Sequence, residues 1–295
     1  MRNFSGGSKR RAYFEGWYFK QQNGASTVAF IPALHIDEDG GRSASVQVIT
    51  DGGSFCIPFE GAALRADRRT LSVEVGGSHF SGRGLRVDLH GNGCDVKGRL
   101  SFGALTPPRG DVMGPFRFVP AMQCRHGVVS MEHTVRGILS VNGARMDFDG
   151  GTGYIEKDWG SSFPSSYLWT QCNRFDGASC AVMVSIADIP LGGGHFTGCI
   201  CCVRQTDREY RLATYRGAKV VSYDAKGFLV RQGALRLAGE LLEGAPHPLS
   251  APDRGAMRRV ISESAACTMR YRLYDGVTLL FDLVSDQAGF EYAAV

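Results

Sequence analysis

The strongest constraint on the fold of this 295-residue chain is a series of short segments in which apolar and polar residues alternate. Residues 11–24, 26–37 and 43–53 are examples, and each ends in a glycine or a polar turn. Alternation with period two places successive side chains on opposite faces of a strand, and many such runs at regular spacing are typical of sandwiches and barrels. Only residues 233–243 show weak helical spacing, and alternation explains them equally well. The sequence therefore predicts an all-β fold.

Residues 105–127 interrupt this rhythm with four prolines and no clean alternation, so we interpret them as the crossing between two halves. A chain of this length holds two domains of ordinary size. A faint duplication supports this, because Trp17 precedes the turn Asn23-Gly24 much as Trp169 precedes Asp176-Gly177. We expect an N-terminal β-domain over residues 1–127, including the crossing, and a C-terminal β-domain over residues 128–295.

Composition excludes several function classes. The net charge of +4 is spread over both signs and gives no footprint for nucleic acid, and no phosphate loop or dinucleotide fingerprint is present. We expect no nucleic-acid partner and no cofactor. No apolar run approaches the ~20 residues of a membrane-spanning helix, and the start lacks the apolar core of a signal peptide. Nine scattered cysteines suit reduced thiols. These features predict a cytoplasmic protein, in which the run Lys9-Arg10-Arg11 could make transient contact with a membrane surface.

The densest chemistry lies in residues 151–175, which hold two of the three tryptophans. The loop 160–166 has turn chemistry, so this stretch reads as strand, loop and strand. In the second strand one face carries Tyr167, Trp169, Gln171, Asn173 and Phe175. Buried amides need partners, so a face that mixes them with aromatic rings suits a wall around a ligand better than a dry core. A tight structural corner with aromatic packing is the alternative.

Carboxylates accompany both aromatic clusters. Glu156 and Asp158 share one face of the first strand with Tyr154, and Glu15 precedes Trp17. A carboxylic acid enclosed by apolar rings is disfavoured as an anion, which raises its pKa and leaves a group able to donate a proton near neutral pH. The alternative is a salt bridge to Lys157 or an arginine.

Histidines and cysteines form no recognisable metal module. His195, Cys199, Cys201 and Cys202 match no ordinary zinc spacing, and in an extended strand Cys202 faces away from the other two thiols. We expect no metal site. The odd separation of His126 and His133 predicts opposite faces of one strand, and His133 is kept as a candidate substrate-binding residue.

The motifs taken together resemble the tocopherol cyclase family over most of the chain. They are residues 16–20 (GWYFK), 153–160 (GYIEKDWG) with Phe163-Pro164, 169–173 (WTQCN), 251–257 (APDRGAM) and 261–264 (ISES). Plant members have Asn where this chain has Asp158.

The resemblance implies two lipocalin-like antiparallel β-barrels and chemistry on hydrophobic isoprenoid or polyene substrates. In the cyclase reaction an acid protonates a double bond near a quinol ring, and the phenolic oxygen captures the cation; aromatic walls suit that cation. We therefore expect a cofactor-independent cyclase that closes a chromanol-type ring, with a hydratase or a non-catalytic carrier on the same scaffold as alternatives. The candidate catalytic residues are Glu156, Asp158 and Glu15, and the candidate substrate-binding residues are Trp17, Phe19, Tyr154, Trp159, Tyr167, Trp169, Gln171, Asn173 and His133. Strands 13–19 and 167–175 are expected to line a common cavity.

Overall fold

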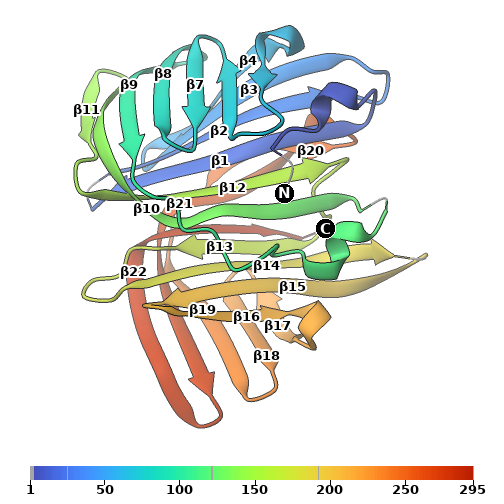
Figure 1. Cartoon of the computed structure of the whole chain (residues 1–295), viewed down its shortest axis with the longest axis vertical. Helices are drawn as coiled ribbons and strands as arrows, with labels where there is room; N and C mark the ends of the chain where they lie inside the picture. The colour runs from blue at the N-terminus through green and yellow to red at the C-terminus, as the bar shows by residue number, and fades with distance from the viewer. Residues whose placement is uncertain (1–2, 25, 121, 192, 295) are drawn as a thin grey trace. The chain divides into compact units, whose positions relative to one another are not determined.

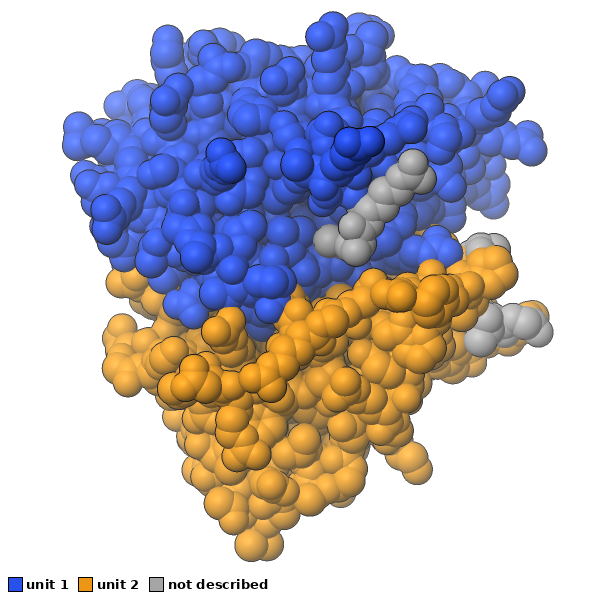
Figure 2. Space-filling model, in the orientation of Figure 1, with its two compact units in different colours: residues 1–107, 124–163, 249–260 blue, residues 108–123, 164–248, 261–295 orange. Residues whose placement is uncertain are grey.

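Antiparallel strands make up almost all of the regular structure, as the alternation predicts. The computed structural model describes residues 3–24, 26–120, 122–191 and 193–294. They divide into two compact units, coloured separately in Figure 2: unit 1 comprises residues 1–107, 124–163 and 249–260, and unit 2 comprises residues 108–123, 164–248 and 261–295. The units are interleaved along the chain, whereas the sequence suggested a single boundary after residue 127.

Unit 1 is built on one large antiparallel sheet with the strand order β4-β3-β2-β1-β12-β10-β9-β8-β7-β6-β5, in which β11 pairs with β10 (Figure 1). Its strands are β1 (Tyr13–Asn23), β2 (Ser26–Ile36), β3 (Arg42–Thr50), β4 (Gly53–Glu60), β5 (Arg65–Ala66), β6 (Ser72–Val75), β7 (Ser78–Ser81), β8 (Gly84–Gly91), β9 (Cys94–Phe102), β10 (Cys124–Val141), β11 (Ala144–Asp147) and β12 (Gly151–Gly160). Two short 3-10 turns, η1 (Gly6–Ser8) and η2 (Gly61–Ala63), accompany them. Neighbouring strands follow one another in sequence except where β12 inserts between β1 and β10.

The core of unit 1 lies on the face of this sheet that carries Trp17, Phe19 and Ile155. Phe80 packs against Phe19 and Phe30, with ring centroids 5.5 and 5.9 Å away. Valine and leucine side chains from β6, β8 and β9 complete the cluster. Because each strand contributes every second residue, the core confirms the period-two pattern read from the sequence.

Unit 2 is built on a second antiparallel sheet with the order β16-β15-β14-β13-β22-β21-β19-β18-β17, and β20 pairs with β21. Its strands are β13 (Tyr167–Cys172), β14 (Cys180–Leu191), β15 (Gly194–Gln205), β16 (Arg208–Ala213), β17 (Lys219–Asp224), β18 (Gly227–Gln232), β19 (Leu235–Glu243), β20 (His247–Asp253), β21 (Ala256–Asp275) and β22 (Thr278–Ala293). Residues 249–260 of β20 and β21 are grouped with unit 1, where the Gln47 amide binds the backbone of Ser250 at 2.9 and 3.0 Å. Leu168, Met269 and Tyr271 lie in the unit 2 core. Residues 233–243, ambiguous in sequence, contain a strand.

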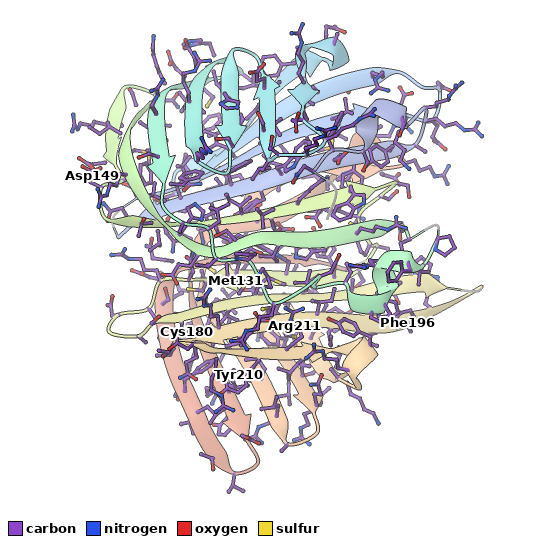
Figure 3. All side chains as sticks on the ribbon, in the orientation of Figure 1. Met131, Asp149, Cys180, Phe196, Tyr210 and Arg211 are labelled. Atoms are coloured by element: carbon purple, nitrogen blue, oxygen red, sulfur yellow. The ribbon has the colours of Figure 1, made fainter. Side chains whose placement is uncertain are left out.

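Residues 105–120 and 122–123 of the proline-rich crossing contain no strand. Its residues 108–123 lie in unit 2, where they form the 3-10 turn η3 (Gly114–Phe118). Phe116 packs near Tyr215, in η4 (Thr214–Arg216), and near Phe196, which Figure 3 shows beside this turn; both ring centroids are 6.1 Å away. The hydroxyl of Tyr215 donates a hydrogen bond to the carbonyl of Val112 at 3.0 Å. In the described part of the chain, helices are all too short to traverse a bilayer.

Candidate active site

Strand β12 carries the acidic motif and lies between β1 and β10 in unit 1. In the register Glu156 is opposite Tyr18 of β1 and Val128 of β10, while Lys157 is opposite Trp17. Side chains alternate, so β12 presents two chemically different sets of residues to the two faces of the sheet.

The interior face holds a buried ion pair. Nζ of Lys157 lies 2.5 Å from Oε1 of Glu15, and the two side chains are 1% and 0% exposed. The Glu15 carboxylate also accepts hydrogen bonds from the amides of Ser5 and Gly6, the latter at 2.7 Å, and from the hydroxyl of Tyr13 at 3.0 Å. Lys157 donates to the Asn3 carbonyl at 2.9 Å. This pair therefore holds the N-terminal segment against the sheet.

Aromatic rings surround the same ammonium group. It lies 5.4 Å from the ring centroid of Trp17 and 4.8 Å from that of Trp159, both within the range of a cation–π interaction. Lys157 is thus paired with Glu15 and lies beside two indoles, on the face of β12 opposite Glu156 and Asp158.

The opposite face of β12 brings together Tyr154, Glu156 and Asp158 with His126 of β10. The Tyr154 hydroxyl donates to Oε2 of Glu156 at 2.5 Å. Nδ1 of His126 lies 2.9 Å from Oδ1 of Asp158, and its Nε2 lies 3.6 Å from Oε2 of Glu156. Glu156 is 4% exposed and His126 8%. Two carboxyl groups, an imidazole and a phenol therefore form one cluster, which is buried except at the part-exposed Asp158.

The proton positions in this cluster follow from its geometry. A carboxylate at Asp158 only accepts hydrogen bonds, so Nδ1 of His126 carries a hydrogen and Nε2 faces Glu156. Nε2 lies 3.6 Å from Oε2 of Glu156, beyond direct hydrogen-bond distance, so a neutral His126 turns an unprotonated nitrogen toward this carboxyl group. A protonated His126 forms ion pairs with both carboxylates. The cluster can therefore hold one proton at either Glu156 or His126. Burial, Asp158 and Glu156 raise the pKa of the nearby Cys124 thiol, which keeps it neutral.

Two residues of this site were missed by sequence reasoning. His126 reaches the acids only because β10 pairs with β12, a non-local contact that no spacing reveals. Tyr18 is 6% exposed and its ring centroid lies 6.5 Å from that of Tyr154. Because Tyr18 follows Trp17 directly in an extended strand, the two rings face opposite sides of the sheet, and this alternation could have predicted Tyr18 at the site. Tyr18 and Tyr154 are the aromatic rings adjacent to Glu156.

Unit 2 has a polar aromatic face of its own on β13. Tyr167, Trp169 and Gln171, with Asn173 just after the strand, are all buried, and Leu168 and Cys172 face the core, as predicted from parity. Phe175, predicted to share the face of Trp169, packs in the core against Tyr271 instead, because β13 ends at Cys172 and the alternation does not continue beyond it. The Tyr167 hydroxyl donates to Oε2 of Glu291, on β22, at 2.8 Å. Both amide atoms of Gln171 are buried with no hydrogen-bond partner among the described residues. This face is therefore built for polar contacts, and Glu291 is a residue that sequence reasoning missed.

The structure divides the residues predicted from sequence into three sets. Glu156, Asp158 and Tyr154 meet at the cluster with His126. The second set lies on the interior face of unit 1, across the sheet from Glu156, and comprises Glu15, Trp17, Phe19, Trp159 and His133. The third set, on β13, belongs to unit 2. The common cavity expected for strands 13–19 and 167–175 involves both units and stays a prediction.

One group of described residues has the composition to hold a metal ion. His126, Glu156 and Asp158 offer ligand atoms within 4.8 Å of one another. The other histidine and cysteine candidates lie on β15, where Cys199, Cys201 and Cys202 are buried and His195 pairs with Asp188 at 2.9 Å. Burial raises the pKa of Cys202 to about 12. The hydrogen bond between Cys199 and Cys201 raises the pKa of Cys201 well above its usual value and lowers that of Cys199.

Comparisons with known sequences identify a relationship over part of the chain. Residues 94–216 match the family model described as tocopherol cyclase-like. A probable chloroplastic tocopherol cyclase of Oryza sativa subsp. japonica is 31% identical over 108 residues, which cover 35% of this chain and 22% of that protein. The chloroplastic tocopherol cyclase of Zea mays is 41% identical over 51 residues, 17% of this chain and 11% of that protein. The chain therefore spans less than a quarter of these relatives, and the matched family range contains the whole acidic cluster.

Comparisons with solved structures extend over nearly the whole chain. The crystal structure of CghA with Sch210972 aligns with a TM-score of 0.58 at 9% identity, covering 96% of this chain and 88% of that one. Kievitone hydratase from Nectria haematococca aligns at 0.54 and 11% identity, covering 96% and 89%. A putative AttH from Nitrosomonas europaea aligns at 0.53 and 14% identity, covering 94% and 92%. These likenesses establish a shared fold and confirm the predicted all-β, lipocalin-like architecture.

Proposed function

We propose, starting from the confirmed resemblance to the tocopherol cyclase-like family, that this chain is an acid-promoted cyclase of hydrophobic prenylated substrates. The reaction is an intramolecular addition of a phenolic O–H across a double bond. A proton from the enzyme adds to one alkene carbon, the phenolic oxygen bonds to the resulting tertiary cation, and the phenolic proton returns to the enzyme. No atom is gained or lost overall.

The observation that supports this proposal best is the environment of Glu156. Its carboxyl group is buried, held by the Tyr154 hydroxyl at 2.5 Å, and faced by His126 at 3.6 Å. A positioned acid in a water-poor site is the requirement for protonating an alkene, because alkenes are weak bases and bulk water is a poor proton donor. A carrier protein has no need of such a group.

Each neighbour of Glu156 has a role in this scheme. Tyr154 fixes the orientation of the carboxyl group, and the rings of Tyr18 and Tyr154 present π faces suited to a passing cation. His126 accepts or returns the proton through Nε2, while Asp158 holds its Nδ1–H. The Asp158 side chain is 22% exposed and links the cluster to solvent. Glu156 is the proton donor, and His126 and Asp158 restore its protonation state.

The test is to compare the parent protein with Glu156→Gln on a panel of prenylated hydroquinones. Glutamine keeps the shape of the protonated acid and can still accept from Tyr154, so ligand binding should remain within a few-fold. Turnover should fall by ~10²–10⁴ or more, the usual contribution of a positioned general acid. Glu74→Gln, a change of the same type on β6 of unit 1, serves as the matched control and should retain full turnover. Unchanged turnover in Glu156→Gln would overturn the assignment.

Product mass separates the alternatives. Cyclisation leaves the substrate mass unchanged, whereas a hydratase using the same acid adds one water. A carrier binds the hydroquinone and returns it unaltered in both parent and variant. The acidic cluster favours the two enzymes over the carrier, and the family resemblance favours the cyclase over the hydratase.

A further inference from the structure

The interior face of unit 1 contains a second polar site, separate from the acidic cluster. Gln21 of β1 and His133 of β10 are 0% and 2% exposed. Both amide atoms of Gln21 and Nε2 of His133 have no hydrogen-bond partner among the described residues. Buried polar atoms are paired in the great majority of cases, and leaving them unpaired is destabilising. Three such atoms in one place therefore indicate a missing partner.

The hydrogen bonds of Ser130 define the tautomer of His133. The Ser130 hydroxyl has one hydrogen, which it donates to the Glu132 carbonyl at 2.8 Å, and it accepts from the amide of Thr106 at 3.1 Å. Its contact with Nδ1 of His133 at 3.2 Å is then one in which Nδ1–H donates. Burial lowers the pKa of His133 to about 4, so the ring is neutral near pH 7. Nε2 is consequently a bare acceptor.

Gly153 shows that the two side chains converge on one point. It is the Cα partner of both Gln21 and His133 in the sheet. A Cβ atom at position 153 would lie 2.4 Å from Nε2 of His133 and 2.5 Å from Oε1 of Gln21. A larger side chain at position 153 would have to displace the ends of both groups. The Phe102 ring, with its centroid 4.5 Å from that of His133, forms an apolar wall.

We propose that Gln21 and His133 form a hydroxyl-binding site inside unit 1. One O–H group donates to Nε2 of His133 and accepts from the amide NH₂ of Gln21, whose oxygen and nitrogen can exchange by a flip. A carboxylate does not fit, because it would face the Nε2 lone pair. The buried Glu15–Lys157 pair lies about 20 Å along β1 from Gln21. The hydroxyl belongs either to water or to a small neutral alcohol or phenol. The site lies across the sheet from Glu156 and does not depend on the proposed function.

The test uses phenol and toluene as probes of the full chain, with the Nε2 resonance of His133 followed by ¹⁵N NMR. Phenol should shift this resonance and bind roughly tenfold or more tightly than toluene, which leaves Nε2 unpaired. Glu156→Gln should respond as the parent does. Gly153→Ala should lose the phenol response. If that variant fails to fold, Gln21→Leu, which keeps the volume of the site, takes its place and should remove the preference for phenol over toluene.

A crystal structure with and without phenol distinguishes the two sources of the hydroxyl. Phenol within hydrogen-bond distance of both side chains supports an organic hydroxyl, and a water that bridges them in the phenol-free crystal and gives way to phenol shows which hydroxyl fills the site otherwise. A bridging water that phenol does not displace, with no phenol response by NMR, would overturn the site as one for organic hydroxyls. A direct hydrogen bond between Gln21 and Nε2 with nothing between them, or a protonated Nε2 at neutral pH, would overturn it.

Discussion

Replacing Lys157 by methionine tests the interior ion pair. The variant leaves the Glu15 carboxylate, 0% exposed, without its 2.5 Å partner. Breaking a buried pair from one side typically costs about 3–5 kcal/mol, because an uncompensated charge remains. The donors from Ser5, Gly6 and Tyr13 still support the carboxylate and moderate this loss. The lost cation–π contacts with Trp17 and Trp159 add to it, at up to about 2 kcal/mol for a desolvated ammonium. We expect the free energy of unfolding to fall by about 4 kcal/mol.

The assay is urea-induced unfolding followed by tryptophan fluorescence, in which Trp17 and Trp159 report on unit 1. The double variant Glu15→Gln/Lys157→Met should be more stable than Lys157→Met alone, because it contains no unpaired charge. Arg145→Met is the surface control in unit 1: its partner Asp147 lies at 3.4 Å, but the arginine side chain is 68% exposed, so the loss should stay below about 1 kcal/mol. If Lys157→Met also loses less than about 1 kcal/mol, the reasoning about burial is refuted.

Three further predictions follow from the geometry. His126→Gln should slow steady-state turnover by on the order of 10² while slowing the first turnover much less, because it removes the return path for the proton; equal losses in both rates would contradict that role. Burial lowers the pKa of His35 from 6.5 to about 4, so between these pH values the unfolded chain binds more protons than the folded chain. The free energy of unfolding should therefore be highest above pH 6.5 and fall by about 3 kcal/mol as the pH decreases to 4. His35→Gln should show a correspondingly shallower fall in unfolding free energy, and a curve parallel to that of the parent protein would count against burial as the cause. Dialysis against a chelator should leave turnover unchanged, whereas loss of activity restored by zinc, with zinc content abolished in His126→Ala, would mean that the cluster acts as a metal centre.

The period-two alternation was enough to predict the all-β class and the face on which most residues lie. It grouped Tyr154, Glu156 and Asp158 on one face, and the structure places them together, with Lys157 and Trp159 on the opposite face of β12. It also separated His126 from His133. These predictions succeed because side-chain parity is a local property of an extended chain.

Strand pairing is not a local property, and this is where sequence reasoning stopped. His126 joins Glu156 only through the β10–β12 pairing, and Glu15 meets Lys157 only through β1–β12, across more than a hundred residues of chain. The interleaving of the units has the same origin, because β10 and β12 return to the sheet begun by β1 after the crossing segment has entered unit 2. No composition shift marks such a return.

The central claim is that Glu156 delivers the proton that starts cyclisation, and solvent deuterium incorporation tests it most directly. A prenylated hydroquinone is converted in D₂O, and the deuterium placed on the former alkene carbon is measured by mass spectrometry over time. Parent protein should incorporate one deuterium per ring closed, and Glu156→Gln should do so at least ~10² times more slowly with substrate still bound. Incorporation at the parent rate in Glu156→Gln would show that another group donates the proton.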